Sequence, residues 1–212
     1  MLMDGSIKNY VDQVASGAPT PGGGSVAALA GSLGSALTSM VGNLTIGKKA
    51  YKELDDEIKK EMEENFNELQ KSIERLNHIV DEDTKAFSGV MEAFKLPKET
   101  EEEKAKRTAA IQEGYKLALE VPLRCAEECF RVLELQEIFA EYGNVNAITD
   151  VGVGALLAAT GLEGALFNVT INLLSIKDTE YRNKMEEKVD QLLKDGTRLK
   201  EDLLKTVYGR LG

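Results

Sequence analysis

The chain has 212 residues, a formal net charge of −10 at pH 7, one histidine and two cysteines. This length suits one large domain or two small ones, and the acidic balance argues against nucleic acid and anionic membranes as partners. One histidine and two cysteines cannot build a zinc site without several carboxylates, and the N-terminus shows no basic region followed by an apolar stretch. We therefore expect a cytoplasmic protein without a metal, in which Cys125 and Cys129 are reduced core thiols.

The first elements along the chain are a short helix and a helix without charge. Ile7, Val11 and Val14 predict the short helix, which ends before Pro19. A proline–glycine loop then opens into the uncharged helix, from about Ser25 to Ile46. One stripe of this helix is large and apolar (Val26, Leu29, Leu33, Leu37, Met40 and Leu44), and another is small (Ala27, Gly31, Ser35, Thr38 and Gly42). With no solvated face, this helix is expected to be buried all round against other helices or another subunit. Its loop and its many Ser, Thr, Gly and Asn residues argue against a membrane span.

The next part of the chain is rich in Glu and Lys. Apolar residues recur at helical spacing from Leu54 to Phe94, which predicts one long amphipathic helix that Pro97 ends. Thr100 and Glu103 form a capping-box signature, so we expect another helix to begin there.

The second half of the chain predicts further helices. Pro122 fits the first turn of a helix that ends at Tyr142. A second apolar segment, residues 144–176, is expected to break into two helices near Gly161, and residues 179–208 form the last helix. No segment alternates with a period of two. The sequence therefore predicts an all-α fold: a single-domain helical bundle over residues 1–212, with long amphipathic helices around the buried Gly/Ala-rich helices.

One acidic residue interrupts the apolar stripe of the long helix. Between Val80 and Phe87 the stripe passes through position 83, which is Asp. A carboxylate on an inward face needs a hydrogen bond, an ion pair or a function, because burying it alone is costly. Asp83 is therefore either a cap or ion-pair partner, or an acid/base group in a cleft. We expect its neighbours Asp81 and Glu82 to point into solvent.

Further polar side chains occur in the second apolar segment. Asp150 is the only charge between Tyr142 and Leu162, and it stands where a helix N-cap is expected. It is either a plain cap or a carboxylate aimed into a cleft. Four asparagines share the segment, namely Asn144, Asn146, Asn168 and Asn172. Buried amides need partners, which each other, the backbone or a bound polar heterocycle would supply.

The glycine loop and a lysine beyond the uncharged helix complete the candidate sites. Gly22, Gly23 and Gly24 either make a tight turn or present backbone N–H groups that attract an anion at a helix start. Lys48 is favourable near a helix C-terminus and is also a cation that an acidic ligand would need. His78 lies off the apolar stripe and is expected to be exposed. Any catalysis would then fall to carboxylates and lysines.

Four segments, in this order, resemble the cyclodeaminase/cyclohydrolase family. They read PTPGGGSVAALAGSLGSALTSMVGNLT, DEDTKAFSGVMEAFKLPKETEEEK, VPLRCAE and GNVNAITDVGVGALLAATGLEGALFNVTINL, and the resemblance covers nearly the whole chain. That family includes the C-terminal domain of formiminotransferase-cyclodeaminase and stand-alone bacterial methenyltetrahydrofolate cyclohydrolases. The resemblance implies an all-helical homodimer that binds a tetrahydrofolate derivative near the subunit interface, with no cofactor beyond this substrate.

The resemblance also implies chemistry at the one-carbon bridge between N5 and N10 of tetrahydrofolate. The main expectation is cyclodeamination, in which N10 attacks the formimino carbon on N5 and ammonia leaves. The alternative is cyclohydrolysis, in which water attacks the methenyl carbon and 10-formyltetrahydrofolate forms. We expect Asp83 as the leading general acid/base, Asp150 as the second carboxylate, the asparagines and the glycine loop around the pterin, and Lys48 at the glutamate tail. A helical scaffold or a non-catalytic folate-binding protein is the alternative of another class.

Overall fold

The structure, a computed structural model, describes residues 1–86 and 88–212, with Ala86 described by its backbone only. Its elements follow the chain as η1 (Leu2–Asp4), α1 (Ile7–Val14), α2 (Gly23–Thr45), α3 (Lys49–Lys52), α4 (Asp56–Ala86), α5 (Ser88–Phe94), α6 (Glu101–Tyr142), η2 (Val145–Ala147), α7 (Ile148–Leu173) and α8 (Thr179–Leu211). No strand occurs among the described residues, and the expected all-α class is confirmed.

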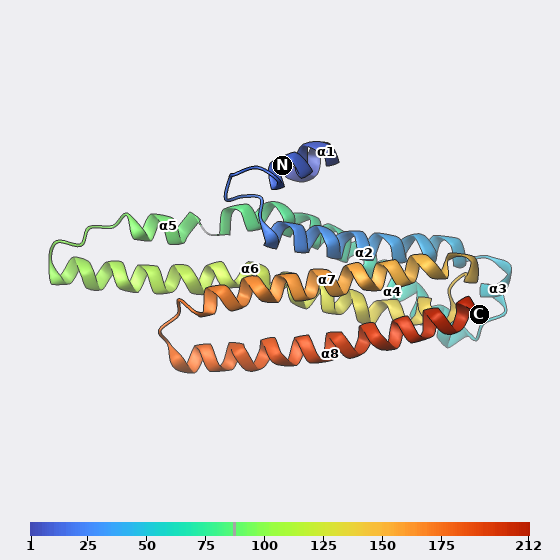
Figure 1. Cartoon of the computed structure of the whole chain (residues 1–212). Helices are drawn as coiled ribbons and strands as arrows, with labels where there is room; N and C mark the ends of the chain where they lie inside the picture. Colours follow the sequence, from blue (N-terminus) through green and yellow to red (C-terminus); the bar gives the residue numbers. More distant parts are fainter. Residues whose placement is uncertain (87) are drawn as a thin grey trace.

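The two apolar helices, α2 and α7, run antiparallel along the bundle (Figure 1). Helix α4 packs against α2 and α6, and α6 also packs against α7. Helix α8 covers α7 and α6 from the other side, whereas α1 stands outside the bundle near the start of α2. The short helix α5 packs on α6. The start of α2 and the end of α7 therefore lie at the same end of this helix pair, and α5 and the first part of α6 extend beyond it (Figure 1).

Helices α2 and α7 meet backbone to backbone. A Cβ atom added to Gly34 would lie 2.7 Å from the Gly154 carbonyl oxygen. At Gly161 it would lie 2.7 Å from the Ala27 carbonyl oxygen and 2.8 Å from the Cys129 sulfur. Such distances leave no room for a side chain, so this contact requires glycine at these positions.

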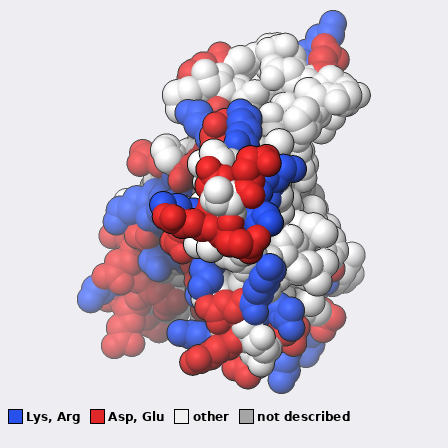
Figure 2. Space-filling view, turned by 90° about the vertical axis from the view of Figure 1, so that its left-hand side faces the viewer, with Lys and Arg blue, Asp and Glu red and all other residues white. Residues whose placement is uncertain are grey.

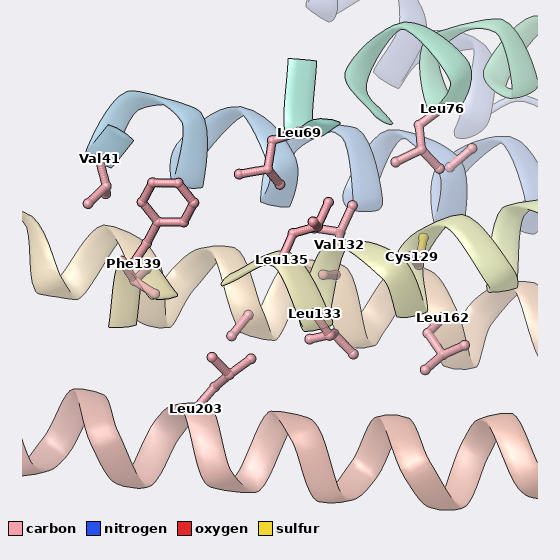
Figure 3. Packing of buried hydrophobic residues seen from close by; sticks show 14 of the residues in the cluster. Val41, Leu69, Leu76, Cys129, Val132, Leu133, Leu135, Phe139, Leu162 and Leu203 are labelled. Carbon is pink, nitrogen blue, oxygen red and sulfur yellow. The ribbon is translucent and has the colours of Figure 1, made fainter. Parts of the chain in front are cut away.

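Large apolar side chains from α4, α6 and α8 fill the space around this contact (Figure 3). They include Leu69, Leu76, Val132, Leu133, Phe139 and Leu203, all 2% exposed or less. One buried polar pair crosses the core, because the Gln136 side-chain amide donates to the Thr38 hydroxyl at 2.8 Å. Cys125 and Cys129 are free and buried, as expected.

The uncharged helix α2 is not buried all round by this chain alone, and its burial against another subunit stays a prediction. Its small stripe faces the core, whereas Val26, Leu33, Met40 and Leu44 are exposed. Large apolar residues of α7 are exposed in the same way, with Phe167 67% and Ile171 61% exposed. The physical reason is that close backbone contact turns the small residues inward and leaves the large ones outside. In Figure 2 the uncharged surface on the right belongs to this side, and the charged side chains gather elsewhere.

Three helix boundaries also differ from expectation. Helix α6 runs through Pro122 without a break, and α7 runs through Gly161, because both residues are buried in tertiary contacts that hold the helix together. The region from Leu54 to Phe94, expected to be one helix, contains α4 and α5; Phe87 lies outside the described residues.

Two helical segments, Gly23–Thr45 and Val145–Leu173, are long and apolar enough to cross a membrane by length and composition. Core helices of soluble proteins pass the same test, and 61% and 50% of the 18-residue apolar stretches in these two segments are buried inside the bundle.

The backbone contact predicts a large cost for one added methyl group. Gly161→Ala should lower the free energy of unfolding by about 1–3 kcal/mol, because the helices must separate to admit the Cβ. Gly209→Ala on α8 is the matched control, since nothing lies within 4 Å of its added Cβ. It should be neutral or stabilising by up to about 1 kcal/mol. Denaturant unfolding measures both, and a Gly161→Ala variant as stable as the wild type would contradict the contact.

Candidate functional site

A cavity of about 680 Å³ opens at the end of the bundle where α2 begins and α7 ends. It is walled by the loop before α2, the end of α4, α5, the middle of α6 and the end of α7. Its lining includes Gly22, Gly23, Gly24, Asp83, Thr84, Met91, Tyr115, Ala118, Pro122, Asn168, Ile171 and Asn172. The volume and the mixture of apolar walls with a few polar groups suit a small organic ligand.

Asp83 is the acidic group in this wall. Its carboxylate is half-buried and accepts a hydrogen bond from the Ser25 backbone N–H in the first turn of α2. Burial raises the pKa of Asp83 above its ordinary value, although the Ser25 hydrogen bond opposes this. Gly24 lies directly against the carboxylate, and a Cβ there would overlap it. Asp83 is thus an inward carboxyl, as its place in the apolar stripe predicted, and it caps α2 from another helix.

Ser25 links the acid to two other elements. Its hydroxyl donates to the Val80 carbonyl oxygen at 2.9 Å, and the Tyr10 hydroxyl lies 2.9 Å from the Ser25 hydroxyl oxygen. Tyr10 is buried, and burial raises its pKa. These bonds hold α1, α2 and α4 together beside Asp83.

The neighbours of Asp83 take structural roles outside the cavity. Asp81 is buried and accepts a hydrogen bond from the Leu2 backbone N–H at 2.5 Å, so the expectation of a solvated Asp81 was wrong. Contact between the N-terminal residues and α4 was not predicted from the sequence. Glu82 is partly exposed and pairs with Arg124 at 2.7 Å. His78 is exposed, as expected.

The predicted asparagines of the second half of α7 line the cavity. The Asn168 side-chain amide donates to the Gly164 carbonyl oxygen at 2.9 Å, and the Asn172 amide donates to the Asn168 carbonyl oxygen at 3.0 Å. The Asn168 amide nitrogen would lie 3.6 Å from a Cβ added to Gly23. The glycine loop, Asp83 and these two asparagines are therefore brought together, as the sequence interpretation required.

Four other predicted residues lie at the opposite end of α2. Asn144 holds that end, because its backbone N–H donates to the Thr45 hydroxyl and its side chain donates to the Leu44 carbonyl oxygen. Lys48 lies three residues beyond the end of α2, Asn146 lies in η2, and Asp150 lies in the first turn of α7. Since a helix of 23 residues is about 34 Å long, this end lies far from the cavity of the same chain. Within one chain Lys48, Asn144, Asn146 and Asp150 do not join the site.

The sequence interpretation missed several residues of the wall. Pro122 lies inside α6 and lines the cavity. Because proline has no N–H, it cannot donate to the Ala118 carbonyl oxygen one turn earlier. Met91, Tyr115 and Ile171 form apolar walls of the cavity, and their spacing in the sequence carries no signal for a cavity. Among the described residues, no group of three or more His, Cys, Asp or Glu side chains could hold a metal ion.

Comparison with known proteins gives relatives over the whole length. A methenyltetrahydrofolate cyclohydrolase of Methylorubrum extorquens is 42% identical over 206 residues, which is 97% of each chain. A formimidoyltransferase-cyclodeaminase of Rattus norvegicus is 37% identical over 194 residues, 92% of this chain and 35% of that protein. This chain therefore spans about a third of the rat protein.

Structure and family agree with these relatives. The crystal structure of formiminotetrahydrofolate cyclodeaminase from Thermotoga maritima matches with a TM-score of 0.86 and 29% identity, and the match covers 100% of both chains. Residues 6–191 match the family described as Formiminotransferase-cyclodeaminase. Because this match includes most of the described helices and the whole cavity, the chain belongs to the formiminotransferase-cyclodeaminase family.

Proposed function

We propose that this chain is a folate one-carbon enzyme that acts on the bridge between N5 and N10 of tetrahydrofolate. The main reaction is cyclodeamination of 5-formiminotetrahydrofolate to 5,10-methenyltetrahydrofolate and ammonia. The observation that carries the proposal is Asp83, a carboxyl with a raised pKa in the wall of a cavity of about 680 Å³. The names of the relatives and of the matching crystal structure support the substrate class.

Asp83 suits both steps that the reaction requires. N10 attacks the formimino carbon while a proton moves to the nitrogen that leaves as ammonia, and a carboxyl whose pKa is raised toward neutrality can exchange that proton. The product bridge is cationic, and a nearby carboxylate stabilises the positive charge in a site with apolar walls. The cavity also holds N10 against the carbon, which lowers the entropic part of the barrier.

Cyclohydrolysis is the second candidate. The relative named methenyltetrahydrofolate cyclohydrolase is 42% identical and matches 97% of each chain, which favours this activity directly. Here water adds to the methenyl carbon, the bond from that carbon to N5 breaks, and 10-formyltetrahydrofolate forms. The same carboxyl would take one proton from water and return it to N5, and the second proton of water is released to solvent as the formyl C=O forms.

Two absorbance assays on the purified protein separate the activities. With 5-formiminotetrahydrofolate, a cyclodeaminase raises the near-ultraviolet absorbance of the methenyl bridge. With 5,10-methenyltetrahydrofolate, a cyclohydrolase lowers it faster than the uncatalysed reaction. We expect a gain with the first substrate. A loss with the second alone would assign the cyclohydrolase, and no change in either, with no folate binding, would favour a scaffold protein.

Removal of the Asp83 carboxyl should abolish most of the turnover. Asp83→Asn should lower kcat by about 10²- to 10⁴-fold, because the amide cannot exchange the proton. The fold should survive this substitution. Because the pKa of Asp83 is raised in the folded state, ionised Asp83 destabilises the fold at a pH above that pKa. A neutral amide does not carry this cost.

Two companion variants sharpen this test. Gly24→Ala keeps the carboxyl but displaces it, because the Cβ would overlap Asp83, and should also lower kcat. Glu82→Gln, on the neighbouring acid that pairs with Arg124, is the control and should keep activity. Near-normal turnover in Asp83→Asn would remove Asp83 from the mechanism.

The exposed apolar face of α2 and α7 fits a second copy of this chain. The face consists of Val26, Leu33, Met40 and Leu44 on α2 and Val153, Leu156, Phe167 and Ile171 on α7. It extends along the full length of both helices and would be costly to leave in water. Two-fold pairing of this face with itself would bury it in a homodimer.

An antiparallel pairing accounts for the polar residues at the far end of α2. The same arrangement brings the partner's Asp150 and asparagine-rich helix start toward the cavity. The proposed roles of Lys48, Asn144, Asn146 and Asp150 thus depend on the second copy.

The free cysteines fit the cytoplasmic location, which stays a prediction.

A charge placed in this face should dissociate the dimer. Leu156→Asp should raise the dimer dissociation constant at least about tenfold, because a carboxylate must then be buried. Leu193→Asp, on an exposed leucine of α8, is the control and should stay dimeric. Analytical ultracentrifugation measures both, and the monomeric variant should also bind folate more weakly. A monomeric wild type, or one that sediments with lipid vesicles, would contradict the homodimer.

A further inference from the structure

Two asparagine side chains in the cavity wall have fixed orientations. Asn168 and Asn172 each point their side-chain NH₂ group at the carbonyl oxygen one turn earlier on α7. A carbonyl oxygen can only accept a hydrogen bond, so neither amide can reverse without losing this bond. Each amide oxygen is therefore directed away from its own helix backbone.

These two oxygens are available acceptors beside the cavity. Within the described parts of the chain, no hydrogen bond is donated to the Oδ1 atom of Asn168 or Asn172, and both residues line the cavity. Side chains four residues apart on a helix have Cβ atoms about 5–6 Å apart, so the two acceptors stand one above the other along α7. Ala118 also lines the cavity, and Pro122, one turn later on α6, has no N–H to donate to the Ala118 carbonyl oxygen.

This row of acceptors matches one edge of a reduced pterin. In a tetrahydropterin the 2-amino group and N8–H both donate from one edge of the ring system, and N5 lies on the opposite edge. A site that satisfies buried donors also discriminates strongly against analogues that lack them, because its acceptors are then left unpaired.

The start of α2 fixes where the opposite edge would lie. Asn168 borders Gly23, and the next residue, Gly24, borders the Asp83 carboxylate. The asparagines and the Asp83 carboxylate thus lie on two sides of the first turn of α2. We propose that Asn168 and Asn172 bind the amino edge of the pterin and so turn N5 and the one-carbon group toward Asp83. This inference rests on the proposed function and identifies what determines the orientation of its substrate.

Binding measurements with a pair of ligands test this assignment without turnover. The ligands are 5-formyltetrahydrofolate and its 2-desamino-2-methyl analogue, titrated calorimetrically into the wild type and into Asn168→Ala and Asn172→Ala. Asn183→Ala is the control, on an exposed residue of α8 that does not line the cavity. Circular dichroism and thermal unfolding confirm that each variant is folded.

The expected pattern is specific to the amino edge. At least one of the two cavity variants should bind 5-formyltetrahydrofolate about 5- to 30-fold more weakly than the wild type. The same variant should bind the 2-desamino analogue as the wild type does, and Asn183→Ala should change neither constant. An equal loss for both ligands, or no loss for either, would overturn the assignment while folate binding itself stands. Absence of binding by the wild type would instead overturn the proposed function.

Discussion

The close backbone contact between α2 and α7 is the constraint on which the rest of the structure depends. Glycines and small residues on both helices admit no side chain between them, as the 2.7 Å spacings at Gly34 and Gly161 show. Each glycine within a helix costs up to about 1 kcal/mol in intrinsic propensity, which the packed core around the contact offsets. Because the helices run antiparallel, this contact brings the glycine loop before α2 beside the asparagines at the end of α7.

The same contact divides the functions of the two helices between their faces and ends. On the inward side, the small residues allow α4 and α6 to pack against the pair. Asp83 on α4 then lies at the first turn of α2, where it accepts a hydrogen bond from the Ser25 N–H. Outward, the large residues leave an uncharged side on an otherwise acidic molecule (Figure 2). One end of the helix pair thus carries a cavity, and its length carries a surface suited to a second copy.

The sequence predicts the fold class and half of the candidate site, for identifiable reasons. Helical periodicity is a local signal, and Asp83 stands out because it breaks an apolar stripe. The exposure of the large stripe of α2 within one chain was not predictable, because both stripes lack charge and periodicity cannot show which of them the chain covers. Pro122 was read as a helix start because its local cost is high, and only tertiary packing shows why α6 continues. The distance from Asp150 to the cavity depends on helix direction, which residue patterns do not encode.

A crystal structure with 5-formyltetrahydrofolate bound measures the central claim most directly, because this ligand carries a one-carbon group on N5. The account places the pterin in the cavity between the start of α2 and the end of α7. It puts the one-carbon group about 2.6–3.2 Å from an Asp83 oxygen, the range for proton exchange. A ligand bound elsewhere on the bundle, or an Asp83 carboxylate that faces solvent with the cavity empty, would contradict the account.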